Sequence, residues 1–584
     1  MRLILILIVL ILTNKVFGQT ILPANMFADS IHAPFYYGVA SGDPDSNSVV
    51  IWTHITTNQD SIATVNWEIS DDSTFTNLLQ SGSTVTDSNL QHTVKVDING
   101  LNPSGTYYYR FSDIFGNFSI IGRAKTLANG FVDHTKIAVI SCSSIYSGFF
   151  NAYRRIAERN DLQLLIHLGD YIYDYADADE QIRIPVPADI NPTNKAEFIE
   201  RHKYYLLDPD LRAARAMQSW LVYWDNHDLD RDSVYAKEVF RRWLPLRETP
   251  EVQDNKLYRN LSIGDLAEVY MLDVQTLRNI DTFENGESIM TGREQFDWIT
   301  HEIKNTNAVW KLIGSQKMVG GWYTRGINQS YLNLVPNDGD VFDNGSWDGF
   351  METRNRLFDS ITTHNVNNLM FLSGDAHITV MMDLVKDPFD STSYDKITGN
   401  GAVGTEFLPS SISRGNFDEA GVPRYLSEFF INTSKSANPQ HQHMEINSHG
   451  YGLLEINRDS IIATPYYSEI LTITNTDSAG RSMVMMNGVN HWKRTMNTSL
   501  TFLNNQNNIQ LFPNPASDYF RLKSELENSD EMNCILYDYT GRIIKSFNFT
   551  ETDISTENLS NGFYYLKIEK NNNPVTILKF IIGR

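Results

Sequence analysis

The sequence predicts an α/β protein whose central domain is flanked on both sides by β-rich modules. From about residue 134, short apolar runs alternate with stretches that have helical spacing, as expected for a sheet of parallel strands. Residues 37–111 and 509–584 instead contain short strands separated by turn signals. A chain of 584 residues is also too long to fold around one core, so several domains are expected.

The first 18 residues have the pattern of a secretory signal peptide. Arg2 gives a positive start, residues 3–12 are an unbroken apolar run, and the small residue Gly18 ends the segment. The run is shorter than the roughly 20 residues that cross a bilayer, and no later run reaches that length. We therefore expect residues 1–18 to be removed and the mature chain to be exported, either soluble or surface-attached. A retained signal anchor is the alternative.

The charge and the cysteine content argue against nucleic-acid binding and against a disulfide between the two cysteines. The formal net charge of −22 disfavours nucleic-acid binding, which depends on Lys and Arg side chains that neutralise phosphates. The two cysteines, Cys142 and Cys534, lie in different predicted domains, so a disulfide between them is not expected. An exported free thiol is open to oxidation, and metal ligation would protect Cys142; an ordinary buried thiol is the alternative.

Residues 30–128 are predicted to form an N-terminal β-sandwich. Val65, Trp67 and Ile69 alternate with polar residues, as in a half-buried strand. The segment 101–109 resembles the tyrosine corner of fibronectin type III-like sandwiches. We assign this module a packing role and no catalysis.

The C-terminal part is predicted to be a linker and a separate β domain. Residues 471–508 are an extension that ends in the polar tract 504–508, which has little to bury. Residues 509–584 resemble the C-terminal sorting domain of type IX-secreted bacterial proteins. The resemblance implies recognition by the type IX secretion machinery and a secreted or cell-surface location. A plain accessory β-sandwich is the alternative.

Residues 134–470 are predicted to be the catalytic domain. Helices are expected over 149–158, 195–211 and 237–246, and additional strands over 267–272 and 309–313. The aperiodic segment 320–349, which includes Trp347 and Asp348, is a candidate substrate wall; a surface excursion is the alternative.

Four apolar runs of this domain end at side chains of types that can bind metals. The runs and the residues that follow them are 137–140 before Ser141-Cys142-Ser143, 164–168 before Gly169-Asp170, 221–224 before Asp225-Asn226-His227-Asp228, and 370–373 before Gly374-Asp375-Ala376-His377. In open α/β sheets, ligands bind just beyond the carboxyl ends of the strands. The sequence therefore predicts a metal site at this edge.

The residue types indicate phosphate-ester hydrolysis by two metals. Asp170 can bridge two ions with its two oxygens, and a hydroxide held by the metals would attack phosphorus. A Cys142 thiolate beside a Tyr173 phenolate favours iron(III), whereas Asn226 and Asp375 offer oxygens that suit calcium, magnesium or manganese. His227 is a candidate proton donor to the leaving oxygen.

These residues resemble the motifs of the PhoD-like alkaline phosphatases, within the calcineurin-like metallophosphoesterase superfamily. The motifs are Ser141-Cys142-Ser143, 148–153, 167–173, 224–228, Leu272-Asp273 and 373–377. Their order and spacing agree with the family over about residues 37–467. The resemblance implies a four-layer α/β/β/α core and hydrolysis of phosphomonoesters or phosphodiesters.

The same resemblance implies a site that combines iron with calcium. By carry-over, the iron ligands would be Cys142, Asp170, Tyr173 and His377, and the calcium side would be Asp170, Asn226 and Asp375. Manganese, magnesium or zinc are the other metals considered.

The chain departs from this pattern at two places. The usual Trp-Asp-Asp-His reads Trp224-Asp225-Asn226-His227, which removes one negative charge. The histidine that the superfamily places before its last dyad has no evident counterpart, and Gln316 is a candidate for its place.

The sequence thus predicts an exported metal-dependent phosphoesterase. Two alternatives remain open: a phosphodiesterase or phospholipase that acts on lipid or cell-wall polymer, and a surface-binding protein with a decayed site.

Overall fold

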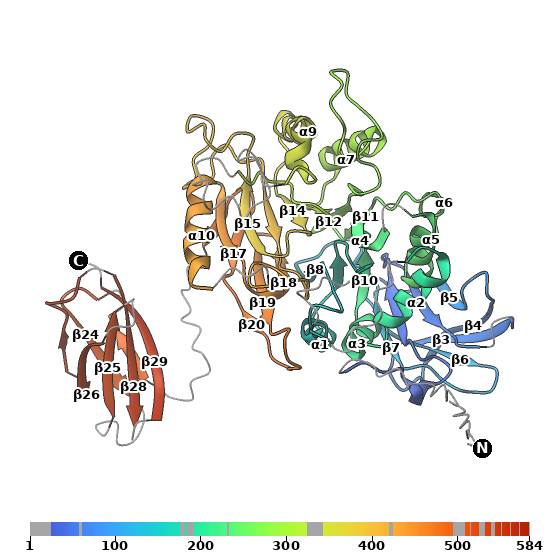
Figure 1. Cartoon of the computed structure of the whole chain (residues 1–584), viewed down its shortest axis with the longest axis horizontal. Coiled ribbons are helices and arrows are strands. Elements are labelled where there is room, and N and C mark those ends of the chain that lie inside the picture. The colour runs from blue at the N-terminus through green and yellow to red at the C-terminus, as the bar shows by residue number, and fades with distance from the viewer. Residues whose placement is uncertain are drawn as a thin grey trace, which may run out of the picture. The chain divides into compact units, whose positions relative to one another are not determined.

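The computed structural model describes most of the chain outside its first residues and a few loops. The described residues are 25–57, 61–175, 182–183, 192–229, 233–323, 343–419, 424–494, 509–513, 516–524, 532–538, 543–550, 552–560, 562–570 and 573–582. The predicted signal peptide and the polar tract 504–508 lie outside them. The chain divides into two compact units between residues 495 and 496, and each is described by itself (Figure 1).

An eleven-stranded sheet forms the first half of the larger unit. Its strands are β1 (Val39–Gly42), β2 (Ser48–His54), β5 (Thr93–Asn99), β8 (His134–Ile140), β9 (Leu164–His167), β10 (Ser219–Val222), β18 (His449–Asn457), β19 (Ser460–Ser468), β20 (Ser478–Ala479), β21 (Met483–Met486) and β22 (Trp492–Arg494). Their order is β22-β21-β19-β18-β8-β9-β10-β1-β2-β5, with β20 beside β19. The central strands β8, β9, β10 and β1 run parallel. The predicted extension after residue 470 thus adds its first part, β20 to β22, to this sheet.

A seven-stranded sheet forms the second half. Its strands are β11 (Arg259–Ile263), β12 (Ala267–Met271), β13 (Trp310–Ser315), β14 (Leu369–Ser373), β15 (Thr379–Leu384), β16 (Gly404–Leu408) and β17 (His441–Glu445), in the order β11-β12-β13-β14-β16-β15-β17. The neighbours β12, β13, β14 and β16 are parallel. Both sheets are therefore mixed, with parallel centres and antiparallel edges.

The two sheets share one hydrophobic cluster. Val139 and Leu165 of the first sheet and Val269 and Leu312 of the second belong to it, all completely buried. Strands covered on both faces need apolar side chains at successive positions, which explains the unbroken apolar runs.

The helices of the described residues are η1 (Ser30–His32), α1 (Asn151–Ala157), α2 (Lys195–Tyr205), α3 (Pro209–Met217), α4 (Asn226–Leu229), α5 (Val234–Trp243), α6 (Pro250–Gln253), α7 (Arg293–Asn305), η3 (Trp347–Phe350), α9 (Met351–Thr363) and α10 (Arg424–Ala437). Ile299 of α7 and Phe358 of α9 pack with Ile313 and Phe371 of the second sheet, beside which Figure 1 shows these helices.

Two sequence-based expectations about this unit are wrong. The helix expected over 195–211 is two helices, because Asp208 caps a new one by accepting hydrogen bonds from Asp210 N and Leu211 N, and Pro209 favours a first turn. Trp347 and Asp348 do not line a substrate wall: Trp347 is fully buried, and Asp348 forms a buried ion pair with Arg354. The intervening residues 324–342 of that segment lie outside the described residues.

The N-terminal β region is continuous with the first large sheet. A four-stranded sheet of β3 (Ala63–Ser70), β4 (Leu78–Thr86), β6 (Thr106–Asp113) and β7 (Gly122–Lys125) packs against β1, β2 and β5 around a separate cluster. The Tyr107 hydroxyl accepts from Asn102 N (2.8 Å) and donates to Asn102 O (3.1 Å), as in a tyrosine corner. Because β1 pairs with β10, the region forms one body with the core instead of an isolated sandwich.

The smaller unit consists of two antiparallel sheets around one cluster of apolar side chains. Its strands are β23 (Ile509–Phe512), β24 (Tyr519–Ser524), β25 (Asn533–Asp538), β26 (Ile543–Asn548), β27 (Ile554–Ser555), β28 (Gly562–Lys570) and β29 (Asn573–Ile582). Cys534 lies in this cluster and Cys142 in the core of the larger unit, both as free thiols. Across the described part of the chain, no helix is both long and apolar enough to cross a membrane.

Gly169 lies where the strand ends of β9 and β10 approach so closely that only glycine fits. Its φ is +116°, and an added Cβ would lie 2.6 Å from Asp225 Cβ. Gly116 also has positive φ (+84°) but open space around it. We expect Gly116→Ala to lower the free energy of unfolding by about 1–2 kcal/mol and Gly169→Ala by about 1–3 kcal/mol more, because only the latter adds overlap. Urea unfolding of both variants measures this, and equal losses would contradict it.

Candidate active site

The loops after β8, β9 and β10 and those after β13 and β14 meet at one edge of the core. Backbone hydrogen bonds join the first two, from Cys142 N to Gly169 O (3.1 Å) and from Ser143 N to Asp170 O (2.9 Å). Asp228 joins the second and third: its carboxylate accepts from the backbone N–H groups of Tyr171 (3.3 Å), Ile172 (3.0 Å) and Asp225 (2.9 Å). The loops are therefore held before any ligand binds.

Four residues at these strand ends have left-handed backbone conformations. Their φ values are 59° at Cys142, 55° at Asp170, 71° at Asp375 and 59° at His377. None is a glycine, so each conformation costs energy that the surrounding structure must offset. Such strain is concentrated at functional sites, where it aims side chains at one point.

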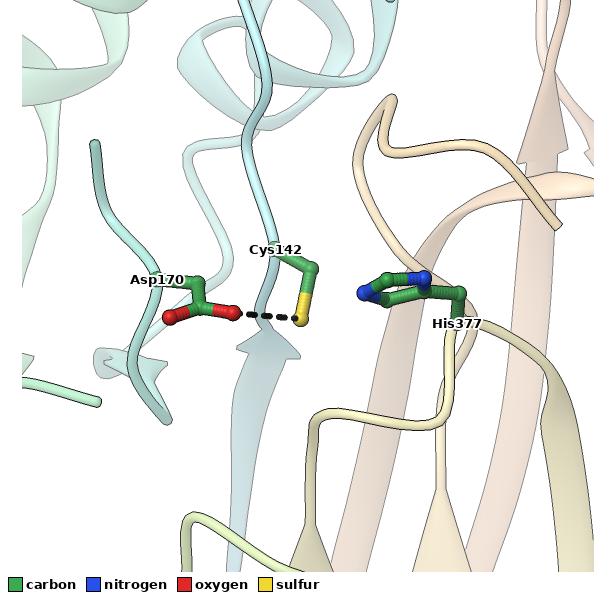
Figure 2. Close-up of side chains that lie close together, drawn as sticks. All are labelled: Cys142, Asp170 and His377. Atoms are coloured by element: carbon green, nitrogen blue, oxygen red, sulfur yellow. Dashed lines mark hydrogen bonds between the residues drawn. The ribbon is translucent and has the colours of Figure 1, made fainter. Parts of the chain in front are cut away.

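Cys142, Asp170, Tyr173 and His377 converge. Ligand atoms of Cys142, Asp170 and His377 all lie within 4.8 Å of one another (Figure 2). Asp170 Oδ2 is 3.8 Å from Cys142 Sγ and accepts a hydrogen bond from the Tyr173 hydroxyl at 3.2 Å. The same hydroxyl is 3.4 Å from His377 Nε2. The sulfur, phenol, imidazole and carboxylate thus offer one donor atom each to a common point.

The protonation of this cluster suits a metal. His377 Nδ1 lies 2.9 Å from the Gly415 carbonyl, so Nδ1 carries the proton and Nε2 presents its lone pair. Burial lowers the pKa of His377 to about 4, so the ring is neutral. Burial, with the Asp170 charge, holds the pKa of Cys142 and of Tyr173 well above their usual values. Both would lose their protons only to a cation.

A second acidic cluster adjoins the first and contains a lysine. Asp170, Asp225 and Asp375 form it, and Lys317 Nζ lies 2.5 Å from Asp375 Oδ1, 3.0 Å from Asp225 Oδ2 and 2.9 Å from Asn226 Oδ1. Burial alone would lower the pKa of Lys317, but Asp225 and Asp375 raise it. Burial raises the pKa of Asp225 to about 7, whereas Lys317 outweighs burial and lowers that of Asp375. The ammonium holds this cluster together.

His227 lies between the two clusters. Its ring stacks on Tyr173 at a centroid distance of 4.1 Å, and its Nδ1 is 2.7 Å from Asp174 Oδ1. Its backbone N–H donates to Asp170 Oδ1 (3.1 Å). Burial would lower the pKa of His227, but Asp170 and the hydrogen bond that His227 donates to Asp174 raise it to about 9. The imidazole is therefore held protonated near neutral pH.

The structure thus brings together all the residues predicted for the site: Cys142, Asp170, Tyr173, Asn226, His227, Asp375 and His377. Gln316, the other candidate, uses its Oε1 to accept a hydrogen bond from Val274 N (3.1 Å) and so holds the loop after β12. Lys317 and Asp174 were missed. Asp174 directly follows the motif 167–173, and Lys317 directly follows the predicted strand end at Ser315-Gln316. Their position next to these strand ends was the only local sign of a role in the site.

Comparisons with known proteins agree with this geometry. Residues 137–239 and 228–464 match the family model described as PhoD-like phosphatase, and residues 22–128 match the model of its N-terminal domain. The chain is 30% identical over 430 residues to alkaline phosphatase D of Bacillus subtilis (strain 168), which covers 65% of this chain and 70% of that protein. The chain belongs to the PhoD-like phosphatase family. It is a phosphoric ester hydrolase of the alkaline phosphatase D type.

A solved structure of PhoD has the same fold as this family member. The two superpose with a TM-score of 0.68 and 25% sequence identity, over 80% of this chain and 93% of the other. PhoD-type enzymes depend on metals. The cluster of Cys142, Asp170 and His377 and the cluster of Asp170, Asp225 and Asp375 are candidate metal-binding groups. Residues 510–583 match a secretion system C-terminal sorting domain, which indicates export or a cell-surface location.

Asp174→Asn is expected to lower the pKa of His227 by about 1 or more, because a neutral amide no longer favours the imidazolium. An NMR titration of the His227 ring proton in the metal-free chain, assigned with His227→Gln, measures the change. Asp133→Asn, at a carboxylate 80% exposed, is the control. A pKa that stays near 9 in Asp174→Asn would show that Asp174 does not set the charge of His227.

Proposed function

We propose that this family member is an exported phosphoesterase that cleaves phosphomonoesters, phosphodiesters or both at the edge where the strand ends meet. The convergence of Cys142, Asp170, Tyr173 and His377 on one point carries the proposal. We also propose that the core is the four-layer α/β/β/α arrangement and that residues 134–470 are its catalytic domain.

Iron(III) is the metal that best fits this first cluster. A thiolate and a phenolate together favour a redox-capable ion over calcium or magnesium. The His377 Nε2 lone pair and Asp170 Oδ2 supply the remaining donors, and the Gly415 carbonyl fixes the ring. Manganese and magnesium prefer oxygen donors, whereas zinc would accept Cys142, Asp170 and His377 but is less suited to the Tyr173 phenolate. When bound, the ion supplies charge for the phosphoryl oxygens and lowers the pKa of a water nucleophile.

His227 is the group we assign to the leaving oxygen. Its Nδ1 is engaged by Asp174, which leaves Nε2 for the substrate. A protonated imidazole beside the scissile bond can give its proton to the departing alkoxide. Arg414, whose guanidinium carbon lies 5.2 Å from the centre of the Tyr173 ring, adds positive charge near the same phosphoryl group.

Calcium, which the family resemblance implies beside iron, would need oxygens of Asp170, Asn226 and Asp375. Lys317 already contacts two of these three residues, so the second cluster fits a divalent ion less well than the first.

Two segments of the chain support the proposed export. The match of residues 510–583 to a sorting domain supports recognition by the type IX secretion machinery. The predicted signal peptide over residues 1–18 would supply the first step of that route.

Asp170→Asn is expected to lower kcat at least about 10²-fold on a chromogenic phosphate monoester and on its diester, because the amide no longer carries the charge that holds the metal. Steady-state assays with added iron measure this, and the monoester-to-diester ratio of the unchanged chain gives its preference. Asp133→Asn is the matched control. Full activity in Asp170→Asn, or no hydrolysis of either ester by metal-loaded chain, would overturn the proposed function.

His227→Gln is expected to show a leaving-group effect. For an alkyl phosphate, kcat/KM should fall about 10²-fold or more, because an alkoxide needs a proton to depart. For a nitrophenyl phosphate, whose phenolate leaves unprotonated, the loss should be about 10-fold or less. Equal losses on both esters would show that His227 does not protonate the leaving oxygen.

A further inference from the structure

The buried lysine at the end of β13 stands where a second metal ion would be expected. The oxygens of Asp170, Asn226 and Asp375 are here called the second cation position. Lys317 Nζ lies 2.9 Å from Asn226 Oδ1 and 2.5 Å from Asp375 Oδ1, and its side chain is only 7% exposed. A calcium ion would bind the same oxygens at about 2.3–2.6 Å. The ammonium and the ion therefore need the same space.

Three oxygens surround the ammonium, which donates hydrogen bonds to Asn226 Oδ1 and Asp375 Oδ1. Besides Asn226 and Asp375, the third is Asp225 Oδ2 at 3.0 Å. Within the described part of the chain, neither oxygen of the Asp225 carboxylate, which is 1% exposed, accepts a hydrogen bond, so the ion pair with Lys317 is its compensating contact. A buried carboxylate without a partner is costly, so Asp225 depends on Lys317.

The lysine is held in place by its own backbone. The Ser315 hydroxyl donates to Lys317 O (2.7 Å) and accepts from Trp347 Nε1 (3.2 Å), both in buried surroundings. The preceding residue, Gln316, is fixed through Val274 N. Lys317 thus leaves a rigid strand end and points at the site.

We propose that the Lys317 ammonium replaces the second metal ion, so that the working chain carries one metal, at Cys142, Asp170, Tyr173 and His377. Lys317 then acts through its charge: it keeps Asp225, Asn226 and Asp375 in place and supplies the second positive charge beside the phosphoryl group. This inference rests on the proposed function, which assigns the first cluster its metal.

Metal counting tests the proposal on the full mature chain. Elemental analysis after gel filtration should find one transition-metal ion per chain and less than about 0.2 calcium per chain. Calorimetric titration with calcium should show no stoichiometric binding. Lys317→Gln, which replaces the ammonium by a neutral amide oxygen, should gain one bound calcium per chain. Lys311→Gln, at a half-buried lysine earlier on β13, is the matched control and should bind none.

Activity supplies a second readout. Added calcium should change kcat of the unchanged chain less than 2-fold, whereas Lys317→Gln should lose about 10²-fold without calcium and regain activity with it. One tightly bound calcium per unchanged chain would overturn the proposal and leave the proposed function standing. If Lys317→Gln does not fold, the calcium count of the unchanged chain still decides. The expected metal count without hydrolysis of any ester would instead overturn the proposed function.

Discussion

The site depends on one constraint: the negative charges of buried carboxylates must be compensated where the strand ends of the two sheets meet. Asp170, Asp225 and Asp375 come from three strand ends and approach one another closely. Burying ionised carboxylates without partners costs several kcal/mol each. Each therefore faces a compensating group: Asp170 the hydroxyl of Tyr173 and the backbone of His227, Asp225 and Asp375 the ammonium of Lys317. Chemistry and stability thus depend on the same compensating groups.

The two sheets make this crowding possible because they supply rigid strand ends. The parallel centres place β8, β9 and β10 of one sheet and β13 and β14 of the other with their carboxyl ends at the same edge. Left-handed conformations at Cys142, Asp170, Asp375 and His377 then turn four side chains inward. Asp228 performs the complementary task for Asp170, since its carboxylate accepts from backbone N–H groups and joins the loop after β9 to the loop after β10.

The sequence alone predicted the strand ends that form the site, but it did not predict the contacts between distant segments. The apolar runs before Cys142, Asp170 and Asp375 end at potential ligands, so the site was predictable from local pattern. The continuity of the N-terminal β region with the core could not be predicted, because the pairing of Ser41 with Ser219 joins segments far apart in the sequence and no local pattern indicates it. Lys317 directly follows a predicted strand end, but its role depends on oxygens 58 and 91 residues away, which the local pattern does not show.

The neutral side chain at Asn226 and the cation at Lys317 are best understood together. In the motif that this chain resembles, an aspartate takes the place of Asn226, and a divalent ion would be its partner. An aspartate with a divalent ion carries a net charge of one positive unit, and an asparagine with an ammonium carries the same. A divalent ion held here beside Lys317 would instead add two positive charges against Asp225 and Asp375, in contact with an ammonium that already forms ion pairs with both. Charge balance therefore favours one metal and one lysine in this chain.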